Sequence, residues 1–230
     1  MTSKDVDDLL TRSVVPDDVD AAAVERAKQA ILGSLTPVRP MAPAWVFTVA
    51  FVILFAVVAI AGGTMLGMYG LHALSGTERA IIFSVVIAGA AFAGLAGARE
   101  MSPAGGRRIG GWVFAGGGIA LLAAFALLFH DYNMASFVKQ GVSCLRAGLL
   151  FAVAGAVIMS LVFVRGYVLN PRGAGLAAGT LAGLAGIGTL ELHCPNLNAM
   201  HVMVWHLGVV VLSGFAGLLI GSIFGKLRTR

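Results

Sequence analysis

The two cysteines of the chain, Cys144 and Cys194, are the residues whose type and position could do chemistry. Each is predicted to lie at the mouth of an apolar helix, Cys144 just before one helix and Cys194 just after the next. Two thiols at one face of a membrane can form a disulfide or bind a soft metal ion together. Either reaction would suit a sensor, although two inert thiols or a permanent structural disulfide would leave the same pattern.

The surroundings of Cys144 predict that it is the more reactive of the two thiols. A helix N-terminus and a nearby cation both favour the thiolate, and Cys144 precedes a predicted helix with Arg146 close by. Cys194 follows the C-terminal end of its predicted helix and lacks this help from the helix dipole.

Histidines add candidate metal ligands near the cysteines. All five histidines of the chain fall on or near the side that carries the two thiols. His193 and His201 are the candidates for further ligands of a cysteine-bound metal ion. His206 is expected to be a hydrogen-bonded residue of a helix interface instead. Because His201 and His206 are five residues apart on one predicted helix, they are not expected to bind haem.

The composition predicts that these residues belong to a membrane protein. Of the 230 residues, 58% are hydrophobic and 12% are charged, whereas a soluble domain carries about 25% charged residues. A bilayer-spanning helix takes about 20 residues. We predict an all-α fold, a six-transmembrane-helix bundle with a short cytoplasmic N-terminal helical arm. The expected spans lie at about 45–67, 80–98, 110–129, 147–164, 173–192 and 202–224.

The distribution of lysine and arginine predicts how the bundle is oriented. Thirteen of the sixteen basic residues fall in the N-terminal segment, in the second and fourth connections and at the C-terminus. The positive-inside rule places these regions, and therefore both termini, in the cytoplasm. Both cysteines then lie on the outer side of the membrane; in bacteria that side is the periplasm, where disulfides can persist. Because the basic residues are scattered over short loops, the net charge of +5 does not indicate nucleic-acid binding.

Small residues at four-residue spacing are expected to mediate helix packing. This spacing puts each set on one face of its helix, where two backbones can approach closely. The resulting contact is either plain tight packing or a surface along which helices slide or rotate. The glycines concerned are Gly175, Gly179 and Gly183 in the fifth predicted span and Gly217 and Gly221 in the sixth.

We predict that residues 1–43 form a separate cytoplasmic segment, called the arm below. Residues 44–230 are predicted to form the membrane domain. The arm is polar and its first apolar run comes late, so we expect no secretory signal. Asp17 is a plausible cap for a helix from about 18 to 35. Three prolines then form a stiff linker to the membrane.

Apolar residues of the arm require a partner, because about 40 residues with few large apolar groups cannot bury a core of their own. The arm could dock on another protein, lie on lipid or pack on the basic loops of the bundle. Its seven acidic and five basic residues do not favour anionic lipid, so a protein partner is the preferred interpretation. The residues expected to bind it are Leu9, Leu10, Val19, Ala23, Ala27 and Ile31.

The sequence around the cysteines resembles the NrsF family of bacterial integral-membrane anti-sigma factors. The similar stretches are GVSCLRAG at 141–148 and ELHCPNLNAMHVMVWHLG at 191–208, together with VDDLL near the start and the six spans. In that family one cysteine precedes the fourth span. A second follows the fifth span in a His-Cys-Pro context, before a tryptophan that opens the sixth. The matching residues are Cys144, Cys194, Pro195 and Trp205.

The resemblance implies a function for the chain. A member of this family holds an extracytoplasmic-function sigma factor at the inner membrane and releases it when a periplasmic cysteine pair meets oxidant or a thiophilic metal. For this chain it implies a sigma-factor partner and a sensing role for Cys144 and Cys194. It implies no cofactor other than a transient thiophilic metal ion at the two cysteines.

Two other functions are alternatives for a six-helix membrane protein. A small-solute or metal transporter would use ionisable groups at mid-depth in its helices, and the predicted spans lack them. A quinone-linked thiol redox protein would carry a Cys-x-x-Cys pair, which the sequence does not contain. No motif indicates a kinase, nuclease or hydrolase, so we do not expect an enzyme.

Overall fold

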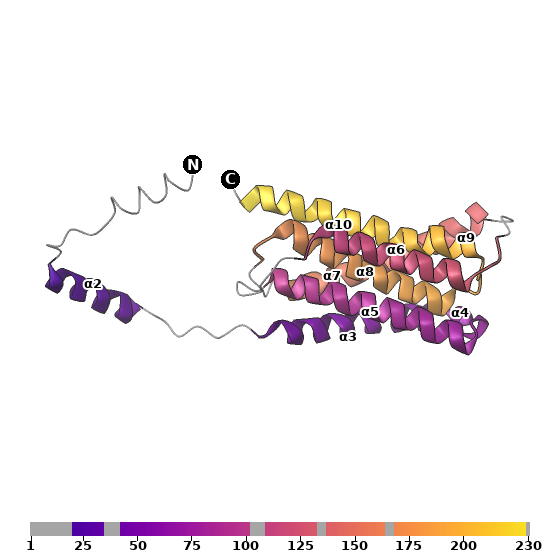
Figure 1. Cartoon of the computed structure of the whole chain (residues 1–230), viewed down its shortest axis with the longest axis horizontal. Helices are drawn as coiled ribbons and strands as arrows, with labels where there is room; N and C mark the ends of the chain where they lie inside the picture. Colours follow the sequence, from indigo (N-terminus) through magenta and orange to yellow (C-terminus); the bar gives the residue numbers. More distant parts are fainter. Residues whose placement is uncertain (1–19, 35–41, 102–108, 133–136, 164–167, 229–230) are drawn as a thin grey trace. The chain divides into compact units, whose positions relative to one another are not determined.

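The computed structural model describes residues 20–34, 42–101, 109–132, 137–163 and 168–228 (Figure 1). These residues form helices and no strands. Six of the helices are long and apolar enough to cross a membrane. The predicted all-α fold with six candidate spans is therefore confirmed, while the cytoplasmic position of the arm remains a prediction.

The chain divides into two compact units, Met1–Pro40 and Met41–Arg230. The larger unit contains the spans. A short helix, α4, joins the first two of them, and the last span is one continuous run of α9, η1 and α10. The helices are α3 (Ala44–Leu66), α4 (Tyr69–Ala73), α5 (Gly76–Glu100), α6 (Gly111–Leu128), α7 (Phe137–Phe163), α8 (Pro171–His193), α9 (Ala199–His201), η1 (Val202–His206) and α10 (Leu207–Arg228).

The predicted spans agree with these helices to within a few residues, except at α7 and at the start of α5. Helix α7 begins at Phe137 rather than at about 147. The stretch between these two positions contains the polar residues Lys139 and Gln140, so its hydropathy excluded it from the predicted span. They are nevertheless helical, and Cys144 therefore lies inside α7.

Local signals in the sequence fix where several helices begin and end. Ser75 and Glu78 form a capping box at the start of α5, in which each side chain accepts from the backbone of the other. Asn170 caps α8 and Asn198 caps α9 through their side-chain oxygens. Gly67 follows α3 with a φ of 94°, a backbone conformation that glycine adopts without strain.

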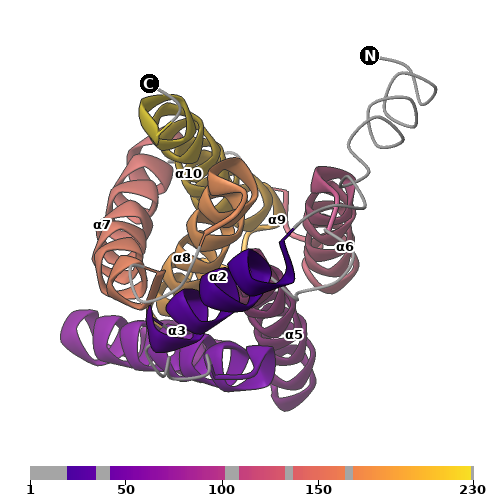
Figure 2. The same cartoon turned by 90° about the vertical axis from the view of Figure 1, so that its left-hand side faces the viewer.

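Helix α8 lies at the centre of the larger unit, where it contacts α3, α5, α7 and α10 (Figure 2). In its most apolar stretch 72% of the residues are buried, against 39% or less in each other span. Glycines allow this close approach from several sides. A Cβ at Gly186 would overlap the carbonyl of Gly148 on α7, and one at Gly188 would lie 2.9 Å from Ala59 on α3.

The contact between α8 and α10 is made by the glycines that the sequence analysis selected. A Cβ at Gly175 would overlap the carbonyl oxygen of Gly217, and one at Gly183 would lie 2.6 Å from Cα of Val210. Gly179 meets Gly217 and Ser213 in the same way, and Gly221 meets the carbonyl of Pro171. We call this backbone contact the glycine seam. Ordinary side chains along it would force the two helices apart.

The smaller unit is described through α2 (Ala21–Ser34). Asp20 begins this helix, since its carboxylate accepts from the backbone N–H of Ala22 at 2.9 Å. Ala23, Ala27 and Ile31 lie exposed on it. The expected cap Asp17 and the expected partner-binding residues Leu9, Leu10 and Val19 lie outside the described residues.

Candidate functional site

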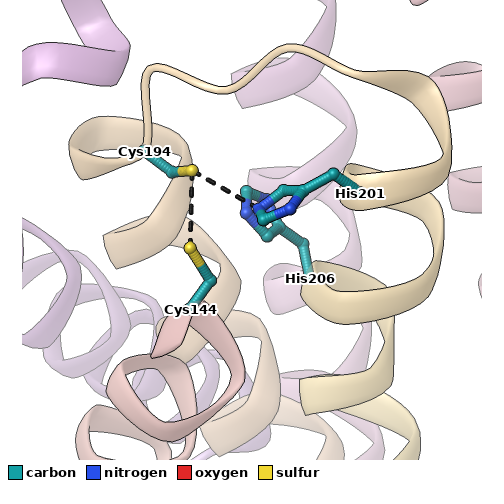
Figure 3. Close-up of side chains that lie close together, drawn as sticks. All are labelled: Cys144, Cys194, His201 and His206. Atoms are coloured by element: carbon teal, nitrogen blue, oxygen red, sulfur yellow. Dashed lines mark hydrogen bonds between the residues drawn. The ribbon is translucent and has the colours of Figure 1, made fainter. Parts of the chain in front are cut away.

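Cys144 and Cys194 meet at the end of the bundle that carries α4 and α9, called the α4/α9 end below (Figures 1 and 3). Their sulfur atoms are 3.5 Å apart although fifty residues separate them in sequence. Both thiols are free, Cys144 half-buried and Cys194 buried. Because the sulfurs already touch, they can form a disulfide or share a metal ion without a rearrangement of the fold.

Cys194 is held at the point where α8 ends. Its backbone N–H donates to the carbonyl of Leu190 at 2.7 Å, and its side chain is 6% exposed. The hydrogen bond with Cys144 and the burial of the side chain both raise the pKa of the Cys194 thiol above its usual value. Cys194 is therefore a protonated thiol at neutral pH.

The position of Cys144 differs from the prediction. It lies seven residues into α7, which is about two helical turns. The field of a helix dipole falls off within the first turn. The expectation that a helix N-terminus activates this thiol therefore does not hold, and the contact with Cys194 is what sets Cys144 apart.

His201 and His206 both lie beside the cysteines. Nε2 of His201 is 3.6 Å from the sulfur of Cys194, and the centres of the two imidazole rings are 5.2 Å apart. The segment between them, η1, is a π-helix, in which the N–H of Leu207 donates to the carbonyl of Val202 five residues earlier. This wider turn brings residues five apart to the same side.

Glu191 holds His206 in place. Its Oε1 lies 2.7 Å from Nδ1 of His206, and the two side chains are only 2% and 1% exposed. The carboxylate accepts a hydrogen bond from Nδ1, so Nε2 is the ring nitrogen that lies away from Glu191. Nε2 of His206 has no hydrogen-bond partner among the described residues.

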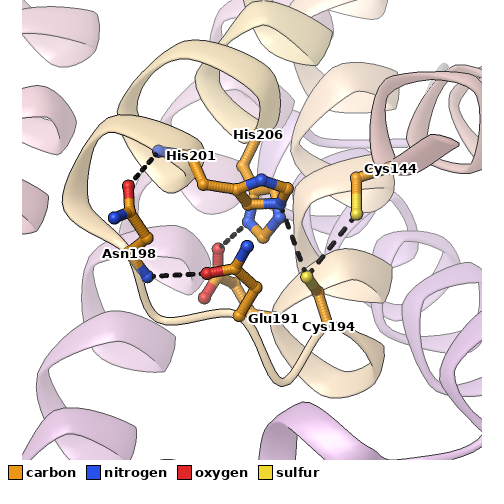
Figure 4. Close-up of polar contacts among 7 residues, drawn as sticks. Cys144, Glu191, Cys194, Asn198, His201 and His206 are labelled. Atoms are coloured by element: carbon orange, nitrogen blue, oxygen red, sulfur yellow. Dashed lines mark hydrogen bonds and ion pairs between the residues drawn. The ribbon is translucent and has the colours of Figure 1, made fainter. Parts of the chain in front are cut away.

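Four side chains therefore form what we call the thiol–imidazole cluster: Cys144, Cys194, His201 and His206 (Figures 3 and 4). Each offers one ligand atom, and these four atoms all lie within 4.8 Å of one another. Cys144, Cys194 and His201 are the ligands predicted from the sequence, whereas His206 was predicted only as a residue of a helix interface. The helical spacing gave no sign of its role, because a π-helical turn cannot be foreseen from a five-residue spacing.

His193, the other histidine that the sequence analysis selected, does not join this cluster. Its Nδ1 is 3.0 Å from the carbonyl oxygen of Gly67, and its ring packs edge-on against Tyr69. The side chain is thus directed toward the turn after α3. His193 lines a cavity together with Cys194, but its Nδ1 takes another direction, because consecutive residues at the end of a helix point in different directions.

Hydrogen bonds and ring packing connect the segments that carry the cluster, namely α7, the loop after α8 and the start of the last span. Asn196 donates to Gln140 on α7 at 2.8 Å, and Oδ1 of Asn198 accepts from the backbone N–H of His201 at 3.0 Å (Figure 4). Trp205 packs on α7 over Gly141, where a Cβ would overlap the indole ring. These contacts fix the loop after α8 and the start of the last span against α7.

A cavity of about 740 Å³ at the α4/α9 end gives access to the cluster. Cys144, Cys194 and His201 line part of it, and Asp131 and Lys139 also contribute. A small oxidant or a metal ion can therefore approach the thiols through a polar opening rather than through the apolar sides of the bundle.

The fold and the site together define an all-α, multi-pass membrane protein with a thiol–imidazole cluster at one end of its bundle. The chain belongs to the NrsF family, because the family model described as negative regulator of sigma F matches residues 33–226. The resemblance found in the sequence is thereby confirmed, and the chain belongs to a family of negative regulators of a sigma factor. No curated protein and no solved structure matches the chain.

The matched region covers all six spans and the thiol–imidazole cluster. Its first residue is Gly33, within α2. All the residues expected to bind the partner precede it, so the family match concerns the bundle far more than the arm.

Proposed function

We propose that this protein is an inner-membrane anti-sigma factor that holds an extracytoplasmic-function sigma factor and releases it when Cys144 and Cys194 react. Family membership supports the regulation of a sigma factor, and the six apolar helices support a membrane anchor. The distribution of basic residues supports cytoplasmic termini. The 3.5 Å contact between the two sulfurs is the observation that carries the sensing step. This role requires no catalytic residue.

Oxidation would link α7 to the end of α8. With hydrogen peroxide as the oxidant, the two thiols together give up two protons and two electrons, the S–S bond forms, and the O–O bond breaks to yield two water molecules. A disulfide is about 2.05 Å long, so the sulfurs would move roughly 1.5 Å closer together. A thiophilic metal ion would link the same two elements through two thiolates.

The glycine seam is the proposed route by which this movement reaches the cytoplasm. It runs along α8 and α10 from Gly183, on the side of the cluster, to Gly221 near the opposite end. Because few side chains interlock across the seam, a small sliding or rotation of α8 against α10 is sterically feasible. The change would then be passed from the cytoplasmic side of the bundle to the arm.

The arm is the segment proposed to hold the sigma factor. On α2 the apolar side chains of Val24, Ile31 and Leu32 are each more than half exposed. A helix that exposes such residues is typical of one that lays its apolar side into a groove of another protein. Leu9, Leu10 and Val19 would extend this docking surface toward the N-terminus.

Replacing both cysteines tests the sensing step. We expect the wild-type protein, captured from its own cells, to retain the sigma factor until peroxide or Cd²⁺ is added and then to lose most of it. The double variant C144S/C194S should retain it throughout, because neither a disulfide nor a dithiolate can form. The measurement is the amount of sigma factor recovered with the protein, and S160A on α7 serves as the matched control.

Two comparisons complete this experiment. Normal release from C144S/C194S would disprove cysteine sensing while leaving the anti-sigma role intact. A chain that lacks residues 1–40 should enter the membrane, since the larger unit is compact on its own, and should retain no sigma factor. Retention by the truncated chain would assign the binding to the bundle and not to the arm.

A further inference from the structure

We propose that the thiol–imidazole cluster is a tetrahedral site for one divalent cation of the zinc class, with both histidines as ligands. The ligand atoms are the sulfurs of Cys144 and Cys194 and Nε2 of His201 and His206. The metal site deepens the proposed function, because the same two cysteines take part. Its biological purpose rests on that function. It adds two histidine ligands and a positioning carboxylate, Glu191, to what that function requires.

The distances in the cluster are close to those that such a cation needs. Zinc is bound at about 2.3 Å by sulfur and about 2.0–2.1 Å by imidazole nitrogen, so tetrahedral ligand atoms are about 3.3–3.8 Å apart. The two sulfurs are 3.5 Å apart, and Cys194 Sγ is 3.6 Å from His201 Nε2. Since no pair in the cluster exceeds 4.8 Å, the set closes around an ion through small side-chain movements.

The chemistry of the donors also favours this class of ion. Two thiolates and two imidazoles in a tetrahedron are the ligand set of zinc and its d¹⁰ relatives. On binding, each thiol releases one proton and the imidazoles coordinate as neutral bases. The charges of the ion and of the two thiolates then cancel, and the hydrogen bond from His206 partly compensates the buried carboxylate of Glu191.

The hydrogen bond between Glu191 and His206 positions the second histidine. Metal-bound histidines usually donate their other ring N–H to a carboxylate, which fixes the tautomer and the direction of the ring. Glu191 accepts at Nδ1 of His206 over 2.7 Å, so Nε2 is left to face the cluster. This buried nitrogen has no hydrogen-bond partner among the described residues, and a bound cation would satisfy it.

The π-helical turn is the element that completes the site. Without it, residues five apart on one helix would point in different directions. The N–H of Leu207 donates to Val202 across this turn, and the rings of His201 and His206 come to within 5.2 Å of each other. Segments of this kind are rare and are found frequently at functional sites.

Metal binding by the purified full-length protein in detergent tests this proposal. The probes are Zn²⁺, measured in competition with a chromophoric chelator, and Co²⁺, whose absorption distinguishes tetrahedral sulfur–nitrogen sites. We expect one ion per chain, with a Co²⁺ spectrum typical of two sulfurs and two nitrogens. Replacing His201 or His206 with alanine should lower the affinity for Zn²⁺ at least tenfold. E191Q should lower it by about 10- to 100-fold through loss of the orienting carboxylate.

A matched control and a second readout make the result decisive. H193A should bind Zn²⁺ as the wild type does, because His193 contacts Gly67 instead of the cluster. Peroxide should still form the Cys144–Cys194 disulfide in H206A and E191Q, which shows that these variants are folded. Disulfide formation with wild-type Zn²⁺ affinity in both variants would overturn the four-ligand site. Binding of fewer than one ion by the reduced wild type would also overturn it.

The outcomes also separate this inference from the proposed function. If the histidine variants bind Zn²⁺ normally while release of the sigma factor still depends on the cysteines, only the four-ligand site is wrong. If the site binds Zn²⁺ as expected while release ignores the cysteines, the proposed sensing step is wrong and the metal site stands.

Discussion

Asn198 joins the loop after α8 to the beginning of the last span. Its Oδ1 accepts from the backbone N–H of His201 at 3.0 Å, and its own backbone N–H donates to Oδ1 of Asn196. The side chain is 6% exposed. It therefore both caps a helix and fixes the backbone of a residue in the thiol–imidazole cluster.

We predict that N198A lowers the free energy of unfolding by about 1 kcal/mol, because the helix loses its cap. N198D keeps an acceptor at the same position and should stay within a few tenths of a kcal/mol of the wild type. Thermal unfolding of both variants in detergent is the measurement. Equal melting temperatures for N198A and the wild type would show that the cap is not needed.

The candidate site could be predicted from the sequence only in part. Two cysteines flanking helices indicated a pair, and His201 was selected because it lies in the same loop region. His206 is the buried, hydrogen-bonded interface residue that was expected, but that it also lies beside the cysteines was not foreseen, because the direction of a side chain near a helix end depends on tertiary contacts. The π-helical turn carries two tertiary contacts, Trp205 over Gly141 and His206 with Glu191. Neither contact leaves a periodic pattern in the sequence.

At the scale of elements, hydropathy located the spans but not every boundary. Apolar composition indicates the apolar part of a helix, whereas the helix itself can extend into polar sequence, as α7 does at Lys139 and Gln140. Four-residue spacing of glycine was more informative. It selected positions that the structure places in backbone contact between α8 and α10, because only glycine permits that approach.

We predict that G217A destabilises the bundle, because a Cβ at this position would overlap the carbonyl oxygen of Gly175. Forcing an extra methyl into a close contact costs about 1–3 kcal/mol. G116A on α6 is the matched control, since a Cβ there meets nothing within 4 Å. Thermal unfolding in detergent compares the two. A G217A protein as stable as G116A would mean that the glycine seam is looser than described.

At the scale of the whole molecule, the sequence sufficed for the class of fold. Six long apolar segments separated by short polar connections leave few arrangements other than a helical bundle. The orientation of that bundle is proposed from the basic residues alone. In the proposed orientation the thiol–imidazole cluster would open to the periplasm, and the far ends of α8 and α10 would face the cytoplasm.

Labelling of cysteines in spheroplasts tests this orientation. After reduction and chelation, a membrane-impermeant maleimide should modify the wild-type protein without permeabilisation, since a cavity reaches Cys144 and Cys194. In the C144S/C194S background, S222C should react only after permeabilisation, because Ser222 lines a cavity near the other end of α10. The reverse pattern would place both termini outside the cell.

Trp205 places a fluorescent side chain next to the thiol–imidazole cluster. Its indole lies over Gly141 and touches the ring of Phe137, and His206 is the next residue. The other tryptophans, Trp45 and Trp112, are 66% and 80% exposed on the outside of the helices. Exchanging those two for phenylalanine would leave a single tryptophan, which lies beside the thiols and can be excited selectively. Light emitted from it would then record events at the cluster in real time, without an attached dye.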